Sequence, residues 1–210
     1  MSLISGEAPV SIPSGPLSLE GALQRPGAPR GRALLCHPHP QMGGTMHDKV
    51  VHHLVRSFQA LDFMTLRFNV RGVGASDGAW DEGAGEREDV TAALAYLMGQ
   101  GAPGPVVLAG YSFGAWVGLR AARLEAAITH RVAVAPPTAL MDFSETLGDE
   151  RPLLILAGGR DMFCLPEQAR SFAEACQAEA TVEVRGGAEH RFHGAGPWFR
   201  AQIAAFMGQG

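Results

Sequence analysis

The chain has 210 residues, with 17 basic and 21 acidic side chains and a formal net charge of −4. This length fits one hydrophobic core, so we expect residues 1–210 to form a single domain. With no basic block, neither nucleic acid nor a membrane surface is an expected partner. Three cysteines are too few for a disulfide framework, and the first residues resemble no secretory signal, which together predict a cytoplasmic protein.

Apolar periodicity predicts that strands and helices alternate along the chain. We expect an antiparallel edge hairpin within residues 8–26. Further strands are expected at 31–37, 63–69, 105–110, 128–135, 151–159 and 180–185, and helices at 47–61, 86–99, directly after Ser112, at 165–177 and at 197–208. This alternation predicts an α/β fold with a mostly parallel central sheet and helices on both faces. In such sheets, ligands bind at the carboxyl ends of the strands.

Residues 105–124 place a serine between a predicted strand and a predicted helix. The motif is Gly110-Tyr111-Ser112-Phe113-Gly114. Glycines two places either side of the serine let the strand and the helix pass closely, and such a turn exposes the serine oxygen above the sheet. The amide of Phe113 would lie at a helix N-terminus, which favours a developing negative charge. The motif is typical of acyl transfer, with Ser112 as nucleophile.

The same G-x-S-x-G pattern occurs at residues 74–78, around Ser76 and Asp77. Glycine and acidic residues follow it, which predicts a loop rather than an immediate helix. We therefore expect Ser76 and Asp77 to bond to nearby backbone and to take no part in catalysis.

A serine hydroxyl needs a base, and the carboxyl ends of later strands are where to seek one. Asp161 follows the strand at 151–159 and His190 follows the strand at 180–185, in the order Ser, Asp, His of hydrolases with this turn. His190 would accept the Ser112 proton and return it to the leaving group. Asp161 would orient the imidazole and stabilise its cation.

Alternatives exist for both partners. His193 is a second candidate base, but it lies beside the turn that starts the last helix. Asp142 and Glu145 follow the preceding strand and are alternative acids. We favour His190 and Asp161, because Asp161 ends a buried strand through a short, glycine-led loop.

The loop after strand 31–37 should supply a second amide to the oxyanion hole. Its two prolines have no N–H and cannot donate. The candidate donors are the remaining loop residues His39, Gln41 and Met42.

His37 and His39 in this loop also allow a metal site to be considered. No acidic or cysteine ligand accompanies them locally, and alternate residues of an extended segment point opposite ways. We expect no metal and no other cofactor, and we expect the two rings to bond to loop backbone.

Together these motifs resemble a known family. The segments HPHPQMGGTMHDKV, RFNVRGVGASDG, GYSFG, GGRD and GAEHRFHG, in this order within residues 31–195, are similar to a small, lidless branch of the α/β-hydrolase superfamily related to the dienelactone hydrolases. The resemblance implies an α/β-hydrolase fold with no large lid domain. It also implies Ser112, Asp161 and His190 as catalytic triad, with the Phe113 amide and the loop after His37 as oxyanion hole. Dienelactone hydrolases carry cysteine at the position of Ser112, so their cyclic substrates are not implied.

We therefore expect a serine hydrolase, active as a monomer or homodimer, that cleaves small carboxylic esters through an acyl-enzyme. A thioesterase, amidase or peptidase would use the same triad, and a non-catalytic binding protein would be expected to lack part of it. Only residues 136–150 connect two predicted strands where many hydrolases of this fold insert a lid, which leaves room for a turn and one short helix. We expect an open cleft walled by Tyr111, Trp80, Phe163 and Phe192.

Overall fold

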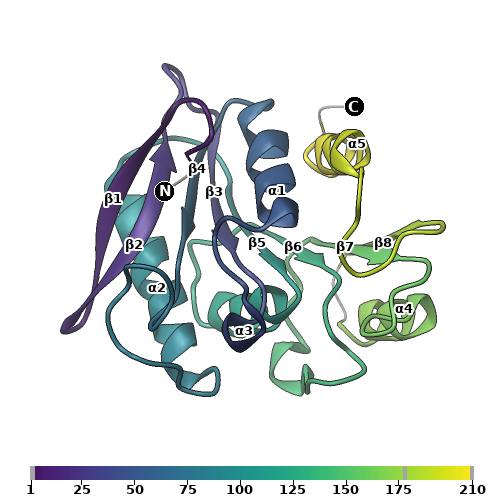
Figure 1. The fold of residues 1–210 in the computed structure, drawn as a ribbon. Coiled ribbons are helices and arrows are strands. Elements are labelled where there is room, and N and C mark those ends of the chain that lie inside the picture. Colours follow the sequence, from purple (N-terminus) through teal and green to yellow (C-terminus); the bar gives the residue numbers. More distant parts are fainter. Residues whose placement is uncertain (1–2, 177–178, 209–210) are drawn as a thin grey trace.

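The computed structural model describes residues 3–176 and 179–208. In this part of the chain, one sheet has eight strands in the order β1-β2-β4-β3-β5-β6-β7-β8 (Figure 1). The strands are β1 (Glu7–Ser14), β2 (Leu17–Gln24), β3 (Gly31–Cys36), β4 (Phe63–Phe68), β5 (Val106–Tyr111), β6 (His130–Val134), β7 (Leu153–Gly158) and β8 (Ala180–Arg185). The hairpin of β1 and β2 is antiparallel and lies at one edge, and β4, β3, β5, β6, β7 and β8 run parallel.

Helices cover both faces of the sheet. They are α1 (Lys49–Gln59), α2 (Ala84–Gly99), α3 (Phe113–Ala122), α4 (Pro166–Ala175) and α5 (Gly196–Phe206), with short 3-10 turns η1 (Pro40–Met42) and η2 (Ser144–Thr146). Helices α1 and α5 pack together on one face, and α2, α3 and α4 lie on the other (Figure 1). The expected fold, a mostly parallel sheet between helices, is confirmed.

The expected element types are confirmed, and the boundaries differ by a few residues. Helix α1 begins at Lys49 rather than at residue 47, because the Asp48 side chain accepts a hydrogen bond from the Val50 N–H and caps the helix. One face of α1 is buried in the core through apolar residues at helical spacing, namely Val50, Val51, Leu54, Val55 and Phe58. The last residue of the helix expected at 165–177 lies outside the described residues.

The loop after β3 is held in place by a buried polar cluster. Arg67 on β4 pairs with Glu7 on β1 at 2.7 Å, and both side chains are fully buried. The same guanidinium donates to the Met46 carbonyl oxygen at 2.7 Å, and Asn69 Oδ1 accepts from the Met46 N–H at 2.8 Å. Because a buried arginine must use its donors, this network fixes the segment that joins η1 to α1.

The connection between β6 and β7 carries no lid domain. It contains turns and the single short 3-10 helix η2, as expected from its length. Among the described residues, no helix combines the length and the apolar character that crossing a membrane would require.

Candidate active site

Ser112 lies at the turn between β5 and α3 in a strained backbone conformation. Its φ of 54° and ψ of −120° fall where residues with a side chain are rarely found. A Cβ at Gly110 would collide with the Gly114 carbonyl, and one at Gly114 would collide with the Cys36 carbonyl. Both glycines are therefore required for the close approach of strand, turn and helix, as the sequence predicted.

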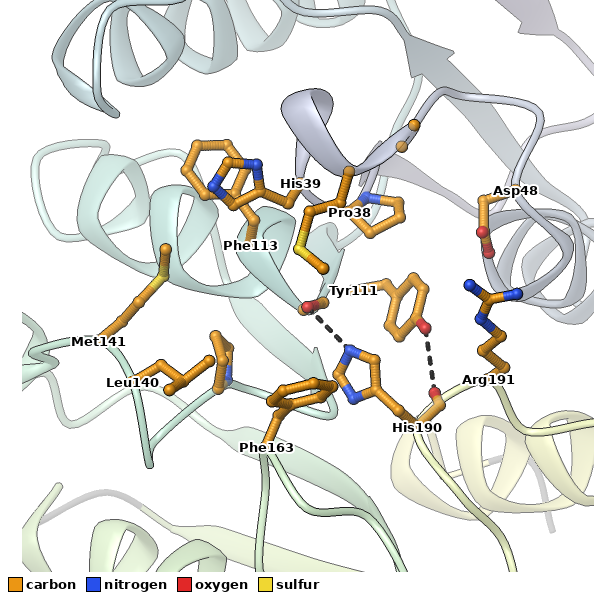
Figure 2. Close-up of a pocket in the computed structure, with 15 residues that line it drawn as sticks. Pro38, His39, Asp48, Tyr111, Phe113, Leu140, Met141, Phe163, His190 and Arg191 are labelled. Atoms are coloured by element: carbon orange, nitrogen blue, oxygen red, sulfur yellow. Dashed lines mark hydrogen bonds between the residues drawn. The ribbon is translucent and has the colours of Figure 1, made fainter.

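The two residues expected from the later strands meet Ser112 at this turn. His190, after β8, places Nε2 3.0 Å from Ser112 Oγ (Figure 2). Its Nδ1 lies 2.8 Å from Asp161 Oδ2. Asp161, after β7, is buried, and its other carboxylate oxygen accepts the N–H groups of Phe163 and Cys164. Since Asp161 accepts the Nδ1–H, Nε2 of neutral His190 is left to accept the serine proton.

The alternative base and the two alternative acids lie away from Ser112. His193 is exposed and lines a neighbouring hollow with Lys49. Asp142 accepts hydrogen bonds from the backbone and side chain of Ser144, and Glu145 pairs with Arg120. None of the three alternatives lines the cavity that contains Ser112.

The second G-x-S-x-G segment is a loop, as predicted. Ser76 Oγ donates to the Asn69 carbonyl and accepts from the Glu20 N–H. Asp77 accepts from the Ser18 N–H at 2.9 Å. This segment therefore fixes the β1–β2 hairpin against the end of β4.

The amides expected to form an oxyanion hole differ in availability. Phe113 is the first residue of α3, so its N–H has no intrahelical acceptor. The Met42 N–H is already bonded to the His39 carbonyl at 3.1 Å, and Gln41 is exposed and does not line the cavity. His39 lines the cavity, and within the described chain its N–H has no hydrogen-bond acceptor. Of the three loop candidates, His39 is the one whose amide is available.

The two histidine rings of this loop behave differently. His37 donates from Nδ1 to the Pro38 carbonyl at 2.7 Å and accepts the Val70 N–H at Nε2 at 3.2 Å, so the prediction that its ring bonds to backbone is confirmed. Burial lowers the pKa of His37 to about 4. The same prediction is wrong for His39, whose Nδ1 is buried without a hydrogen-bond partner in the described residues. Its ring packs instead on Trp80 and Phe113, at centroid distances of 4.8 and 5.1 Å.

The cavity above Ser112 has a volume of about 350 Å³. Its lining includes Tyr111 and Phe163, as predicted, together with residues that the sequence did not single out: Pro38, Gly43, Gly44, Asp48, Pro137, Leu140, Met141 and Arg191. Leu140 is 69% exposed and Met42 78% exposed, so apolar side chains line an open rim.

The prediction that Phe192 and Trp80 line the cleft is wrong. Phe192 is fully buried and stacks on Trp198 and Phe199, because its φ of 47° turns the side chain into the core beneath α5. Trp80 does not line the cavity and lies behind His39, against Phe113.

Tyr111 has a role that the sequence did not reveal. Its hydroxyl donates to the His190 carbonyl oxygen at 3.0 Å, and its ring packs beside the His190 ring (Figure 2). Phe163 packs edge-on against the other side of the imidazole, at a centroid distance of 5.0 Å. The two aromatic side chains therefore fix the position of His190. Burial raises the pKa of Tyr111, which keeps its hydroxyl a donor.

This sheet, with a strained serine after β5 and a Ser–His–Asp hydrogen-bonded chain at its carboxyl edge, defines an α/β hydrolase. The dienelactone hydrolase family model matches residues 76–205, and the chain belongs to that family. An uncharacterized protein of Rickettsia prowazekii is 31% identical over 185 residues, which cover 83% of this chain and 77% of that protein.

Solved structures agree with this assignment. An alpha-beta serine hydrolase homologue from Coxiella burnetii is 33% identical with a TM-score of 0.87, over 97% of this chain and 99% of that one. A serine hydrolase without lid from Xanthomonas campestris is 30% identical with a TM-score of 0.84, over 99% and 96% of the two chains. The protein is thus similar to serine hydrolases, one of which is described as having no lid.

Proposed function

We propose that the protein is a serine hydrolase that cleaves small carboxylic esters through an acyl-enzyme. The observation that carries the proposal is the continuous hydrogen-bonded chain from Ser112 Oγ through His190 to Asp161. A hydroxyl in this arrangement becomes a nucleophile when the imidazole accepts its proton, and the carboxylate stabilises the cation that forms.

In the first half of the reaction, Ser112 Oγ attacks the ester carbonyl carbon while its proton moves to His190 Nε2. The carbonyl oxygen becomes an oxyanion, to which the Phe113 and His39 amides would donate; the start of α3 at Phe113 and the position of His39 in the cavity lining support this role. As the tetrahedral intermediate collapses, the carbon–oxygen bond to the alcohol breaks, and His190 gives its proton to the departing oxygen. The acyl group remains on Ser112.

In the second half, a water molecule takes the place of the alcohol. His190 accepts a proton from the water as its oxygen attacks the acyl carbon. Collapse of this second intermediate breaks the bond to Ser112 Oγ, returns the proton to the serine and releases the carboxylic acid. Because the cavity is open and carries no lid, water reaches the acyl-enzyme without a conformational step.

Labelling with a fluorophosphonate, followed by peptide mass spectrometry, tests the nucleophile. We expect the label on Ser112, and we expect Ser112→Ala to abolish both labelling and hydrolysis of p-nitrophenyl butyrate. Ser76→Ala is the matched control, because Ser76 lies in the same sequence pattern but bonds to backbone. Labelling of Ser76 would contradict the proposal.

The acyl bond that is cleaved is tested with matched substrates. An oxygen ester, a thioester and an anilide of butyric acid differ only in the leaving atom. We expect the oxygen ester to give the highest kcat/KM, and a preference for the thioester or the anilide would assign the same triad to a thioesterase or an amidase.

A further inference from the structure

The cavity around Ser112 has two chemically different sides. Leu140, Met141 and Phe163 are apolar and lie on one side of the His190 imidazole, and Asp48 and Arg191 lie on its other side (Figure 2). An ester also has two arms, the acyl group and the alcohol. The two sides of the cavity would therefore bind different arms of the ester.

The charged side is open to a ligand. Asp48 uses Oδ1 to cap α1 through the Val50 N–H, and among the described residues Oδ2 has no hydrogen-bond partner. Arg191 is exposed and directly follows His190. Within the described chain, neither side chain forms an ion pair, although Figure 2 shows the carboxylate and the guanidinium pointing toward each other.

The charged side continues into a second hollow of about 320 Å³ that shares Gly43, Asp48 and Arg191 with the cavity. Its remaining lining residues all have polar side chains: Thr45, His47, Lys49 and His193. A group that extends from Ser112 past Arg191 therefore meets side chains that all carry polar groups.

We assign the alcohol arm to the charged side. The leaving oxygen must come within reach of His190 Nε2, and Arg191 directly follows His190 in the chain. The acyl group then lies toward Leu140 and Met141. Asp48 and Arg191 line both hollows and carry opposite charges, whereas Lys49 lines only the outer one. A singly charged alcohol beside Asp48 and Arg191 therefore gains attraction from one and repulsion from the other. A neutral hydroxyl can donate to Asp48 and accept from Arg191.

We propose that the natural substrates are esters of a short acyl group with a neutral, multiply hydroxylated alcohol, whose hydroxyls bind Asp48 and Arg191. This inference rests on the proposed esterase function. It assigns the alcohol specificity to two residues on opposite sides of the same hollow.

The test compares kcat/KM of the whole enzyme for four butyrate esters: propyl butyrate, 1-butyrylglycerol, butyrylcholine and O-butyryl glycolate. The first two differ only by hydroxyls, and the last two carry a cation and an anion. A hydrogen bond to a charged group contributes about tenfold in binding, so we expect 1-butyrylglycerol to exceed propyl butyrate about tenfold or more. It should also exceed both charged esters.

Two variants locate the effect. Asp48→Asn keeps the helix cap, because asparagine caps as well as aspartate, and Arg191→Gln removes the guanidinium. We expect each to lower the ratio of 1-butyrylglycerol to propyl butyrate by about tenfold. Arg56→Gln is the matched control, since Arg56 lies on α1 outside both hollows, and it should keep the wild-type ratio.

The outcomes separate this inference from the esterase function. If propyl butyrate is hydrolysed as fast as 1-butyrylglycerol, the alcohol specificity is wrong while the esterase function stands. A preference for O-butyryl glycolate or butyrylcholine would show an anion or a cation site instead. If none of the four esters is cleaved and Ser112 is not labelled, the esterase function itself fails.

Discussion

Acidification should destabilise this protein through His37 at the end of β3. The neutral ring donates from Nδ1 to the Pro38 carbonyl and accepts the Val70 N–H at Nε2. A proton on Nε2 would destroy the second bond and place two donors against each other. Burial correspondingly lowers the pKa of His37 to about 4, from the 6.5 of an exposed histidine.

The sign and size of the effect follow from this shift. Between pH 6.5 and 4 the unfolded chain binds the proton and the folded chain does not, so stability that is fully present above pH 6.5 is lost as the pH falls. A shift of about 2.5 units, at about 1.4 kcal/mol each, is worth about 3.5 kcal/mol. Most of this, about 2.5 kcal/mol, is lost by pH 4.5.

Urea unfolding of wild type and His37→Gln at pH 7.5 and pH 4.5 measures this contribution. At pH 7.5 we expect the variant to be less stable by about 1–3 kcal/mol, because the Val70 N–H loses its acceptor. Between the two pH values the variant should lose about 2.5 kcal/mol less than wild type, since the other histidines are present in both proteins. His193→Gln, at an exposed site, should behave as wild type. Equal losses in wild type and His37→Gln would refute the reasoning.

Two substitutions and one substrate series have defined outcomes. Tyr111→Phe removes the hydrogen bond to the His190 carbonyl, so steady-state kinetics should show kcat reduced about tenfold with KM little changed. An unchanged kcat would mean that packing alone holds His190 in position. Gly114→Ala should destabilise the protein by about 1–3 kcal/mol in thermal unfolding, because the new Cβ would meet the carbonyls of residues 36 and 37. Gly99→Ala is the control: its Cβ would lie in open space at the end of α2, so the substitution should be neutral or stabilising. Activity on p-nitrophenyl esters should be highest from acetyl to butyryl, since the open rim leaves longer chains in water at about 0.8 kcal/mol per CH₂; kcat/KM that rises past eight carbons would contradict this.

The site's central residues could be predicted from the sequence because each is tied to a regular element. Ser112 follows a buried strand and precedes a helix, and Asp161 and His190 each follow a strand of the same parallel sheet. Parallel strands bring their carboxyl ends to one edge, so the order of elements determines the order of candidates. That prediction depended on the order of strands along the backbone and not on the positions of side chains.

The walls of the cleft could not be predicted in the same way. Phe192 was expected in the cleft as a loop side chain, but a positive φ turns it inward onto Phe199. Side-chain direction in a loop depends on single backbone angles, which periodicity does not report.

His190 follows β8, the edge strand opposite the hairpin. Among the described strands β8 pairs with β7 alone, and it is half-buried along most of its length. Ser112 follows β5, which is buried along its whole length and paired on both sides. The two partners of one hydrogen bond thus belong to segments of very different local stability. Opening of the β8 edge, as a sub-global fluctuation, would separate them while the central strands stay protected from amide hydrogen exchange. On mild heating, the hydrogen bond between Ser112 and His190 should therefore be lost before the central strands unfold.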